Sequence, residues 1–259
     1  MTDIEHEVVR LVCNDEYKPV WEPVVLDELG ADQVRVRSEL TCAKHGTEMS
    51  YITGGAINRS SPYLAKQKVF DRTRSNPADP KAFSSTGQTT VGTVTAVGRD
   101  VKHLKEGDRV WGGGRFQTVQ QSAGFRKLDG GLTPEAACCV DPAMFALGAV
   151  RDGKIRVGDN VIVFGMGAIG LFAVQLARLS GALNVVAVDP LANRRSLALR
   201  HGATKAVDPN EVGDFAAASR EWFADGADVT IEASASYGAL NQAIRATRYN
   251  GTVSVLAFY

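Results

Sequence analysis

The spacing of apolar and polar residues divides the chain into two parts of different character. As far as Leu132, short apolar stretches end at glycine or proline, and in residues 33–40 Val34, Val36 and Leu40 alternate with polar positions. A period of two is typical of half-buried strands. The strands predicted in this part are 7–12, 20–26, 33–40, 91–97 and 116–119. Many short strands joined by glycine-containing turns predict a small, partly open β-barrel.

Residues 56–85 interrupt this strand pattern. The segment is polar, contains Pro62, Pro77 and Pro80, and has no clear period. We expect a long irregular excursion over the surface, close to a binding site, because long loops in compact domains are usually functional. Residues 97–111 then form a turn-rich connection that returns the chain to a strand.

Beyond Leu132, apolar strands alternate with segments of helical period. Thr133 is predicted as an N-cap and Pro134 as the first residue of its helix. The predicted strands are 161–164, 185–188, 203–207, 229–232 and 252–256, and the predicted helices are 142–150, 168–179, 193–201, 212–223 and 239–247. This alternation predicts a doubly wound parallel sheet of order 3-2-1-4-5. We therefore expect two domains, residues 1–142 and 143–259.

A glycine triplet after the first of these parallel strands is the strongest chemical signal. Gly165, Gly167 and Gly170 have G-x-G-x-x-G spacing, and they lie between an apolar strand and a helix. This context favours a dinucleotide site over a plain strand–turn–helix connection. The three glycines would permit a tight turn, approach of backbone to a pyrophosphate, and close helix–strand packing. Ala168 and Ile169 begin the helix, whose free N–H groups would bind the phosphates.

The second parallel strand ends in an acid. Asp189 lies about 20 residues beyond the last glycine, where a carboxylate that binds the ribose hydroxyls belongs. A 2′-phosphate would meet like charge there, so NAD is favoured over NADP, although Arg194 and Arg195 would soften the repulsion. Arg194 and Ser234 complete the predicted cofactor-binding residues.

Composition narrows the class of function further. Lys and Arg together number 29, as do Asp and Glu, and this balance argues against a nucleic-acid partner. No apolar run reaches about 18 residues, so we expect no membrane partner. The N-terminus has no signal-peptide core, which predicts a cytoplasmic protein. The four cysteines have no C-x-x-C spacing, so they indicate neither a disulfide framework nor a cysteine-only zinc lobe.

Three stretches resemble the medium-chain dehydrogenase/reductase superfamily, which contains the zinc-type alcohol dehydrogenases and their zinc-free relatives. The stretches read VGRDVKHLKEGDRVW, GDNVIVFGMGAIGLFAVQLARLSGA (after the helices at 133–150) and VVAVDPLANRRSLALRHGA. The resemblance implies an N-terminal GroES-like barrel for catalysis and substrate binding, a Rossmann domain, and hydride transfer at the cleft between them. It also implies a sixth strand and a subunit-pairing strand beyond the fifth. The chain is therefore short at the C-terminus relative to the family, either naturally or because the sequence is a fragment. A homodimer and a homotetramer are the oligomers that the resemblance allows.

The family's zinc ligands are replaced at the matching positions. Residues 45–48 read HGTE where zinc-dependent members have a Cys-Gly-Thr-Asp-like motif, and residues 87–89 read GQT in place of Gly-His-Glu. The third ligand position falls at Asp141. A catalytic zinc needs three Cys, His or carboxylate ligands, and Gln88 offers a neutral amide. We expect neither a catalytic zinc nor the structural zinc lobe, although Glu48 could supply a third ligand.

Without zinc, catalysis is assigned to His45, Thr47 and Glu48. Histidine has an intrinsic pKa near neutrality, so His45 could supply a proton as hydride leaves the nicotinamide. Thr47, which relays a proton in the family, would pass it between His45 and the substrate oxygen or the ribose. Each residue also has a plainer interpretation: a histidine without a role, a threonine that satisfies a turn, and a solvated charge.

The predicted function is that of an NAD(H)-dependent oxidoreductase. It would transfer hydride between nicotinamide and a small alcohol or carbonyl compound: a polyol, a sugar or a secondary metabolite. Two alternatives remain open. One is a zinc-free enoyl or quinone reductase that reduces a C=C bond, and the other is a dinucleotide-binding protein that has lost its chemistry.

Overall fold

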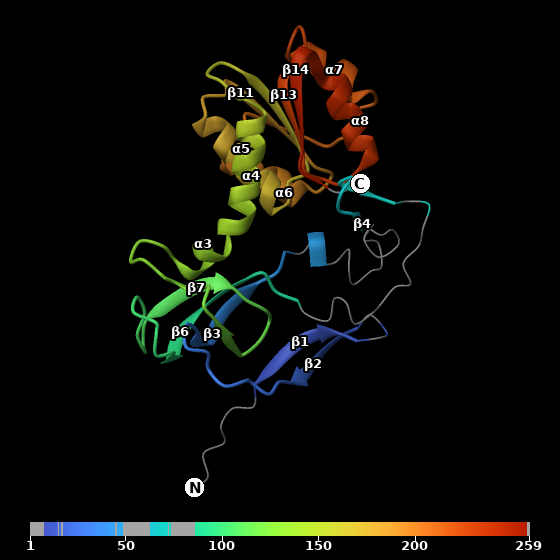
Figure 1. Cartoon of the computed structure of the whole chain (residues 1–259). Coiled ribbons are helices and arrows are strands. Elements are labelled where there is room, and N and C mark those ends of the chain that lie inside the picture. Colours follow the sequence, from blue (N-terminus) through green and yellow to red (C-terminus); the bar gives the residue numbers. More distant parts are fainter. Residues whose placement is uncertain are drawn as a thin grey trace. The chain divides into compact units, whose positions relative to one another are not determined.

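The computed structural model describes residues 8–14, 16, 18–44, 46–48, 63–71, 73 and 86–257. The chain forms two compact units, Met1–Cys138 and Cys139–Tyr259, and each is described by itself (Figure 1). The predicted boundary, between residues 142 and 143, lies slightly further along the chain. The assignment of catalysis to one domain and of cofactor binding to the other stays a prediction.

Antiparallel sheets, with helix α3 at the end, are the main elements in the described part of the first unit. Their bounds are β1 (Val9–Cys13), β2 (Pro19–Pro23), β3 (Val34–Cys42), β4 (Tyr63–Leu64), β5 (Val69–Phe70), β6 (Thr89–Val97), β7 (Arg109–Gly113), β8 (Val119–Ser122), β9 (Arg126–Lys127) and α3 (Pro134–Cys138). The main sheet has the order β8-β3-β6-β7-β9. Alternate residues of β3, Val34 and Val36, are buried with Val94, Val110 and Phe125, as the period of two predicted.

Two sequence-based expectations for this unit are wrong. Residues 116–118 precede strand β8 rather than belong to it. Their backbone groups form hydrogen bonds with side chains and with distant segments of the chain instead of continuing the pairing of β8. Phe116 N–H donates to the carbonyl of Thr86 at 2.8 Å, and the Gln120 side-chain amide donates to the carbonyls of Arg115 and Gln117. The segment 56–85 is not wholly irregular, because β4 and β5 pair within it as a short antiparallel hairpin. Most of that segment lies outside the described residues.

The second unit is a five-stranded parallel sheet with helices on both faces (Figure 1). Its elements are α4 (Val140–Asp152), β10 (Asn160–Phe164), α5 (Ala168–Leu179), β11 (Asn184–Val188), α6 (Ala192–Arg200), β12 (Lys205–Val207), α7 (Phe215–Trp222), β13 (Ala227–Glu232), α8 (Tyr237–Ala246) and β14 (Thr247–Val255). The strand order is β12-β11-β10-β13-β14, and every pairing is parallel. The predicted order 3-2-1-4-5 is therefore confirmed.

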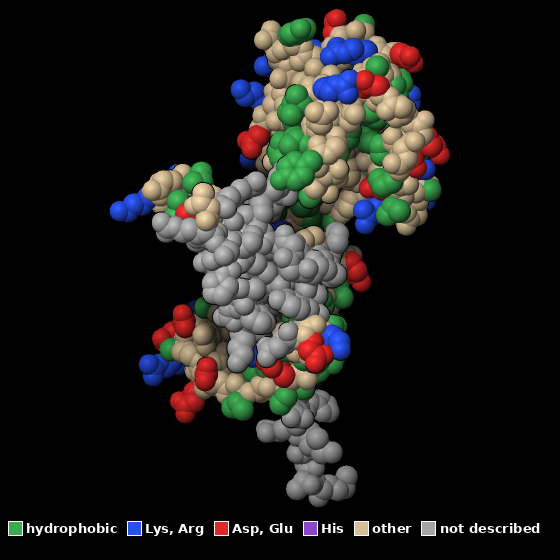
Figure 2. All heavy atoms as spheres, turned by 90° about the vertical axis from the view of Figure 1, so that its right-hand side faces the viewer, with side chains coloured by type: hydrophobic (Ala, Val, Ile, Leu, Met, Phe, Trp, Pro, Cys, Tyr) green, Lys and Arg blue, Asp and Glu red, His purple; other side chains and the backbone are tan. Residues whose placement is uncertain are grey.

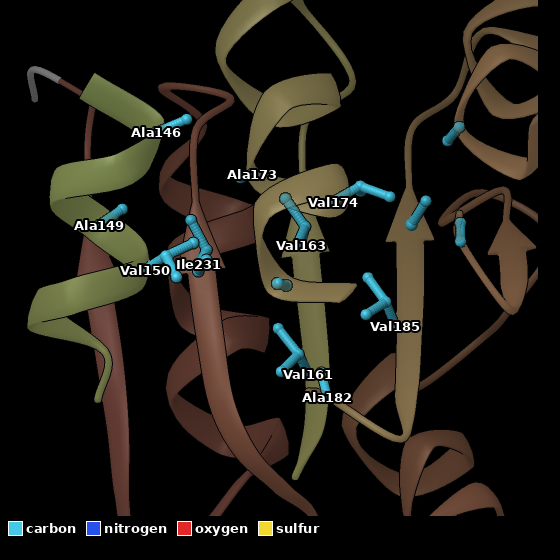
Figure 3. Close-up of a cluster of buried hydrophobic side chains, with 14 of the residues drawn as sticks. Ala146, Ala149, Val150, Val161, Val163, Ala173, Val174, Ala182, Val185 and Ile231 are labelled. Carbon is cyan, nitrogen blue, oxygen red and sulfur yellow. The ribbon is translucent and has the colours of Figure 1, made fainter. Parts of the chain in front are cut away.

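Alternation along β10 divides its side chains between two hydrophobic layers. Val161 and Val163 face one cluster, which contains residues of α4, α5, β11 and β13, whereas Ile162 and Phe164 face a second cluster with α7 and α8. Figure 3 shows the first cluster, where alanines of α4 and α5 lie over branched side chains of the strands. Small residues on the helices let them approach the sheet closely. This packing fixes the carboxyl ends of the strands, where the candidate site lies.

Side-chain caps account for two differences in helix bounds. Helix α7 begins at Phe215, later than the predicted residue 212, because the Asp214 side chain accepts the N–H groups of Ala216 and Ala217. Helix α8 begins earlier than residue 239, because Ser236 caps it through the N–H of Ala239.

No helix in the described part of the chain is long and apolar enough to cross a membrane. The cytoplasmic location stays a prediction. Figure 2 shows positive and negative side chains interspersed on the visible face of the second unit, as the equal numbers of acidic and basic residues suggest.

Candidate cofactor site and candidate catalytic turn

The predicted cofactor-binding residues follow neighbouring parallel strands at one edge of the sheet. From β10 the chain continues to β11 and β12 on one side, and β13 and β14 lie on the other side. Strand order therefore reverses between β10 and β13. Ligands of such sheets bind outside the carboxyl ends of the strands at this switch point. Gly165 follows β10, Asp189 follows β11 and Ser234 follows β13 shortly after its end, so the fold brings them to the same edge.

The three glycines of the triplet have different roles. Gly165 and Gly170 leave no room for a side chain, and Gly167 leaves the N-terminus of a helix without a side-chain cap. Gly165 has a φ of +88°, and a Cβ there would lie 2.8 Å from the backbone nitrogen of Ser234. A Cβ at Gly170 would overlap the carbonyl oxygen of Gly165. Gly167 is the N-cap of α5 and has no side chain to cap the helix. The N–H groups of Ala168 and Ile169, in the first turn, therefore have no side-chain acceptor at the N-cap. This arrangement suits a pyrophosphate.

Asp189 holds the glycine turn in addition to its predicted position beside the ribose. The side chain is only 3% exposed, and its Oδ2 atom accepts the N–H of Met166 at 2.7 Å. Its Oδ1 atom accepts the N–H of Leu191 at 2.8 Å. A carboxylate has about four acceptor positions, so two hydrogen bonds leave capacity for ribose hydroxyls. The sequence located this acid but gave no sign of its bond to the turn.

The two arginines of α6 have different surroundings. The Arg194 side chain is 39% exposed, and its Nη1 atom lies 3.7 Å from the Asp189 carboxylate. Arg195 instead donates to the carbonyls of Asp189 and Pro190 and forms an ion pair with Asp208 at 2.8 Å. Arg195 is therefore committed to the fold, and Arg194 is the better placed of the two to meet a phosphate.

Strand β13 contributes a buried acid that sequence reasoning missed. Glu232 is fully buried, and its Oε1 atom accepts the N–H of Ser234 at 2.7 Å and also the hydroxyl of Ser234. Ser234 itself is exposed at the edge of the sheet. A signal for Glu232 was present, because an acid ends a strand of the parallel sheet here, just as Asp189 follows β11.

In the first unit, Glu48 ties the predicted catalytic turn to the segment that contains Gln88. Its Oε1 atom accepts the N–H of Lys44 at 2.7 Å, and its Oε2 atom accepts the N–H of Gly87 at 3.2 Å. Thr47 lies on the same turn and is half-buried, and His45 lies outside the described residues. Glu48 therefore holds backbone groups with both oxygens. The catalytic roles of all three predicted residues stay predictions.

The described residues do not assemble a site that fits a catalytic zinc. Among them there is no group of three His, Cys, Asp or Glu side chains that could hold a metal ion. The carboxylate of Glu48 binds two backbone N–H groups, and Asp141 lies on α4 in the second unit. Because His45 is outside the described residues, the absence of zinc stays a prediction.

Comparison with known proteins agrees with this geometry. The family model "Zinc-binding dehydrogenase" matches residues 168–259. The chain is 36% identical to the D-guloside 3-dehydrogenase of Escherichia coli (strain K12) over 238 residues, which cover 88% of this chain and 67% of that enzyme. The chain belongs to the medium-chain dehydrogenase/reductase superfamily. The relatives it matches are dehydrogenases, so this medium-chain dehydrogenase/reductase is an oxidoreductase.

Solved structures show the same fold. The 2R,3R-butanediol dehydrogenase of Bacillus subtilis superposes with a TM-score of 0.75 at 25% identity, over 96% of this chain and 77% of that one. A Sinorhizobium meliloti protein, described as a zinc-binding dehydrogenase bound to NADP, gives 0.77 at 23% identity over 98% and 77%. The predicted fold class, antiparallel GroES-like sheets followed by a Rossmann sheet, is confirmed for this medium-chain dehydrogenase/reductase.

Proposed function

We propose that this protein is an NAD(H)-dependent dehydrogenase that interconverts an alcohol and a carbonyl group of a polyol, a sugar or a related small metabolite. The observation that carries the proposal is the placement of Asp189 beside the glycine turn at the switch point of the parallel sheet. The names of the relatives support the substrate class, since they include a guloside dehydrogenase and a butanediol dehydrogenase.

The residues at the sheet edge fit a dinucleotide. The nicotinamide group, when bound, supplies or accepts the hydride. The N-terminus of α5 would bind the pyrophosphate, because Gly167 leaves its first N–H groups without a side-chain cap. Asp189 would accept the hydroxyls of the adenosine ribose and oppose a 2′-phosphate by like charge. These two features favour NAD, and Arg194 at 3.7 Å from the carboxylate would moderate the preference.

Proton transfer is assigned to the turn in the first unit. We infer that His45 gives or takes the proton of the substrate oxygen and that Thr47 relays it. Glu48 would support this turn through the N–H groups of Lys44 and Gly87. No zinc is needed in this scheme, because hydrogen bonding replaces the Lewis acid at the developing alkoxide.

The substrate class is tested with the purified full chain and a panel of carbonyl compounds. We expect NADH oxidation with keto sugars and ketones, and no oxidation with enones or quinones. Turnover of enones or quinones alone would instead assign the protein to the reductases of C=C bonds. NADH binding without any turnover would favour a dinucleotide-binding protein without chemistry.

A further inference from the structure

Glu232 is a fully buried carboxylate at the carboxyl end of the strand next to the switch point. Its neighbours across the sheet are Phe164 at the end of β10 and Val255 at the end of β14. Glutamate is almost never fully buried unless it is paired. Here the carboxylate accepts two hydrogen bonds from a single residue, the N–H and the hydroxyl of Ser234. The acid therefore stabilises the conformation of the chain that follows its own strand.

The loop after β13 is held by a relay of hydrogen bonds that begins at Glu232. The Ser234 hydroxyl oxygen accepts the N–H of Ser236 at 3.2 Å, and the Ser236 hydroxyl in turn caps α8. Between them, Ala235 has a φ of +60°. Left-handed backbone at a residue other than glycine is costly and persists where its surroundings fix it. The hydrogen bonds of Glu232 and Ser234 provide that fixation.

This loop lies directly against the glycine turn. Ala233 N–H donates to the carbonyl of Phe164 at 2.9 Å. The space where Gly165 lacks a side chain is taken by Ser234, whose Cα and Cβ atoms lie 2.8 Å from an ideal Cβ position at Gly165. The turn after β10 and the loop after β13 are therefore fitted to each other, on the two sides of the point where dinucleotides bind.

We propose that Glu232 is a positioning residue for the dinucleotide: it fixes Ser234 against the glycine turn and so shapes the binding surface. This inference rests on the proposed function. A charged acceptor forms stronger hydrogen bonds than a neutral one, and removal of one partner leaves the others unsatisfied. Loss of the acid should release Ser234 and the left-handed residue after it, and cofactor affinity should fall as a result.

The test compares NADH affinity, measured by fluorescence titration, with melting temperature in variants of the full chain. Glu232→Met removes both acceptor positions at similar volume, and we expect about a tenfold higher Kd. Glu232→Gln keeps an acceptor oxygen and should restore most of the affinity. Thr230→Val is the matched control, because this buried hydroxyl on the same strand bonds α8 and Thr247 rather than the loop. It should lower the melting temperature without changing the Kd.

A double-mutant cycle shows whether Glu232 acts through Ser234. Ser234→Ala should raise the Kd by a smaller factor, and Glu232→Met should add less in that background than in the wild type, because contacting residues couple. If Glu232→Met does not fold, Ser234→Ala and Glu232→Gln decide alone, and wild-type affinity in Ser234→Ala overturns the inference. Wild-type affinity in Glu232→Met would also overturn the inference. A rise of Kd in Thr230→Val equal to that in Glu232→Met would do the same. Wild-type protein that binds neither NADH nor NADPH would instead overturn the proposed function itself.

Discussion

At the scale of single residues, Asp189 holds the fold in place at the position where the proposed function puts the ribose of the cofactor. The carboxylate is buried and joins the glycine turn to the end of β11 through the N–H groups of Met166 and Leu191. Two hydrogen bonds leave acceptor capacity on the carboxylate, and we propose that the ribose hydroxyls use it. Sequence spacing alone located this residue, because the distance from a glycine triplet to the acid after the next strand is set by the length of one helix and one strand.

Asp189→Asn should reduce the preference for NADH over NADPH. The variant keeps one acceptor oxygen, for Met166, and loses both the acceptor for Leu191 and the charge that opposes a 2′-phosphate. Like-charge contacts cost several kcal/mol. We expect the ratio of the two dissociation constants to fall by about tenfold or more. Competitive binding of NADH and NADPH measures this ratio, and Asp208→Asn, at an acid that pairs with Arg195, is the control. An unchanged ratio would show that Asp189 does not distinguish the two cofactors.

His45→Ala should lower turnover by roughly 10²–10⁴-fold, the usual contribution of general acid–base catalysis. NADH affinity should remain close to that of the wild type, since the predicted cofactor-binding residues lie in the second unit. Steady-state kinetics with the best carbonyl substrate and a parallel NADH titration separate the two effects. His103→Ala is the control, because this exposed histidine lies in a turn between β6 and β7. Turnover in His45→Ala within about threefold of the wild type would remove His45 from the mechanism.

At the scale of elements, the sequence predicted buried strands well and polar ones poorly. Strand β10 was evident because all its residues from Val161 to Phe164 are apolar and buried on both faces of a parallel sheet. Strand β14 begins at Thr247, five residues before its predicted start. The prediction missed the first half of the strand because that half is polar, and its pairing with β13 is irregular between Ala227 and Val229. The site shows the same limit. The glycine spacing was visible in the sequence. The hydrogen bonds of Glu48 and Glu232 to backbone N–H groups could not be predicted, because the spacing of apolar and polar residues carries no information about them.

The N-terminus of α7 should lose stability as pH falls. A hydrogen bond from Arg245, and then one from the N–H of Ala217, lower the pKa of Asp214. A carboxyl whose folded pKa is lowered stabilises the fold above its unfolded pKa, and this contribution disappears as pH falls through the folded pKa. Asp214→Ala should therefore lower the melting temperature at pH 7, and its difference from the wild type should narrow below about pH 4.

Asp214→Asn is the matched control for the α7 cap. Asparagine caps helices as well as aspartate does, so this variant isolates the charge. Its melting temperature should approach that of the wild type at low pH, measured by circular dichroism from pH 7 to pH 3. A difference between Asp214→Ala and the wild type that stays constant over that range would contradict the assigned role.

At the scale of the whole molecule, the chain combines antiparallel sheets in one unit with a parallel sheet in the other. The family resemblance in the sequence predicted this combination, because three separate stretches carried it. The predicted loss of the metal site depends on residues of both units: positions 45 and 88 belong to the first, and Asp141 belongs to the second. Zinc content is therefore a property that only the intact chain can report.

The purified chain should contain far less than one zinc ion per molecule, and chelators should leave its activity unchanged. Gln88 brings a neutral amide to the second ligand position, and two good ligands rarely hold a catalytic zinc. Elemental analysis together with an assay in the presence of a chelator checks both statements. Stoichiometric zinc, or activity that is lost on chelation and returns with added zinc, would give His45 and Asp141 ligand roles instead.

The bond between Asp189 and Met166 limits how cofactor preference can change in evolution or by design. Deleting the acid to admit a dinucleotide with a 2′-phosphate would also remove the acceptor that holds the glycine turn. A workable path must first pass through a residue that still accepts this N–H, such as asparagine, and only then add positive charge nearby. Substitutions at position 189 therefore have a preferred order. A variant library built on Asp189→Ala would start from a protein whose glycine turn lacks this hydrogen bond.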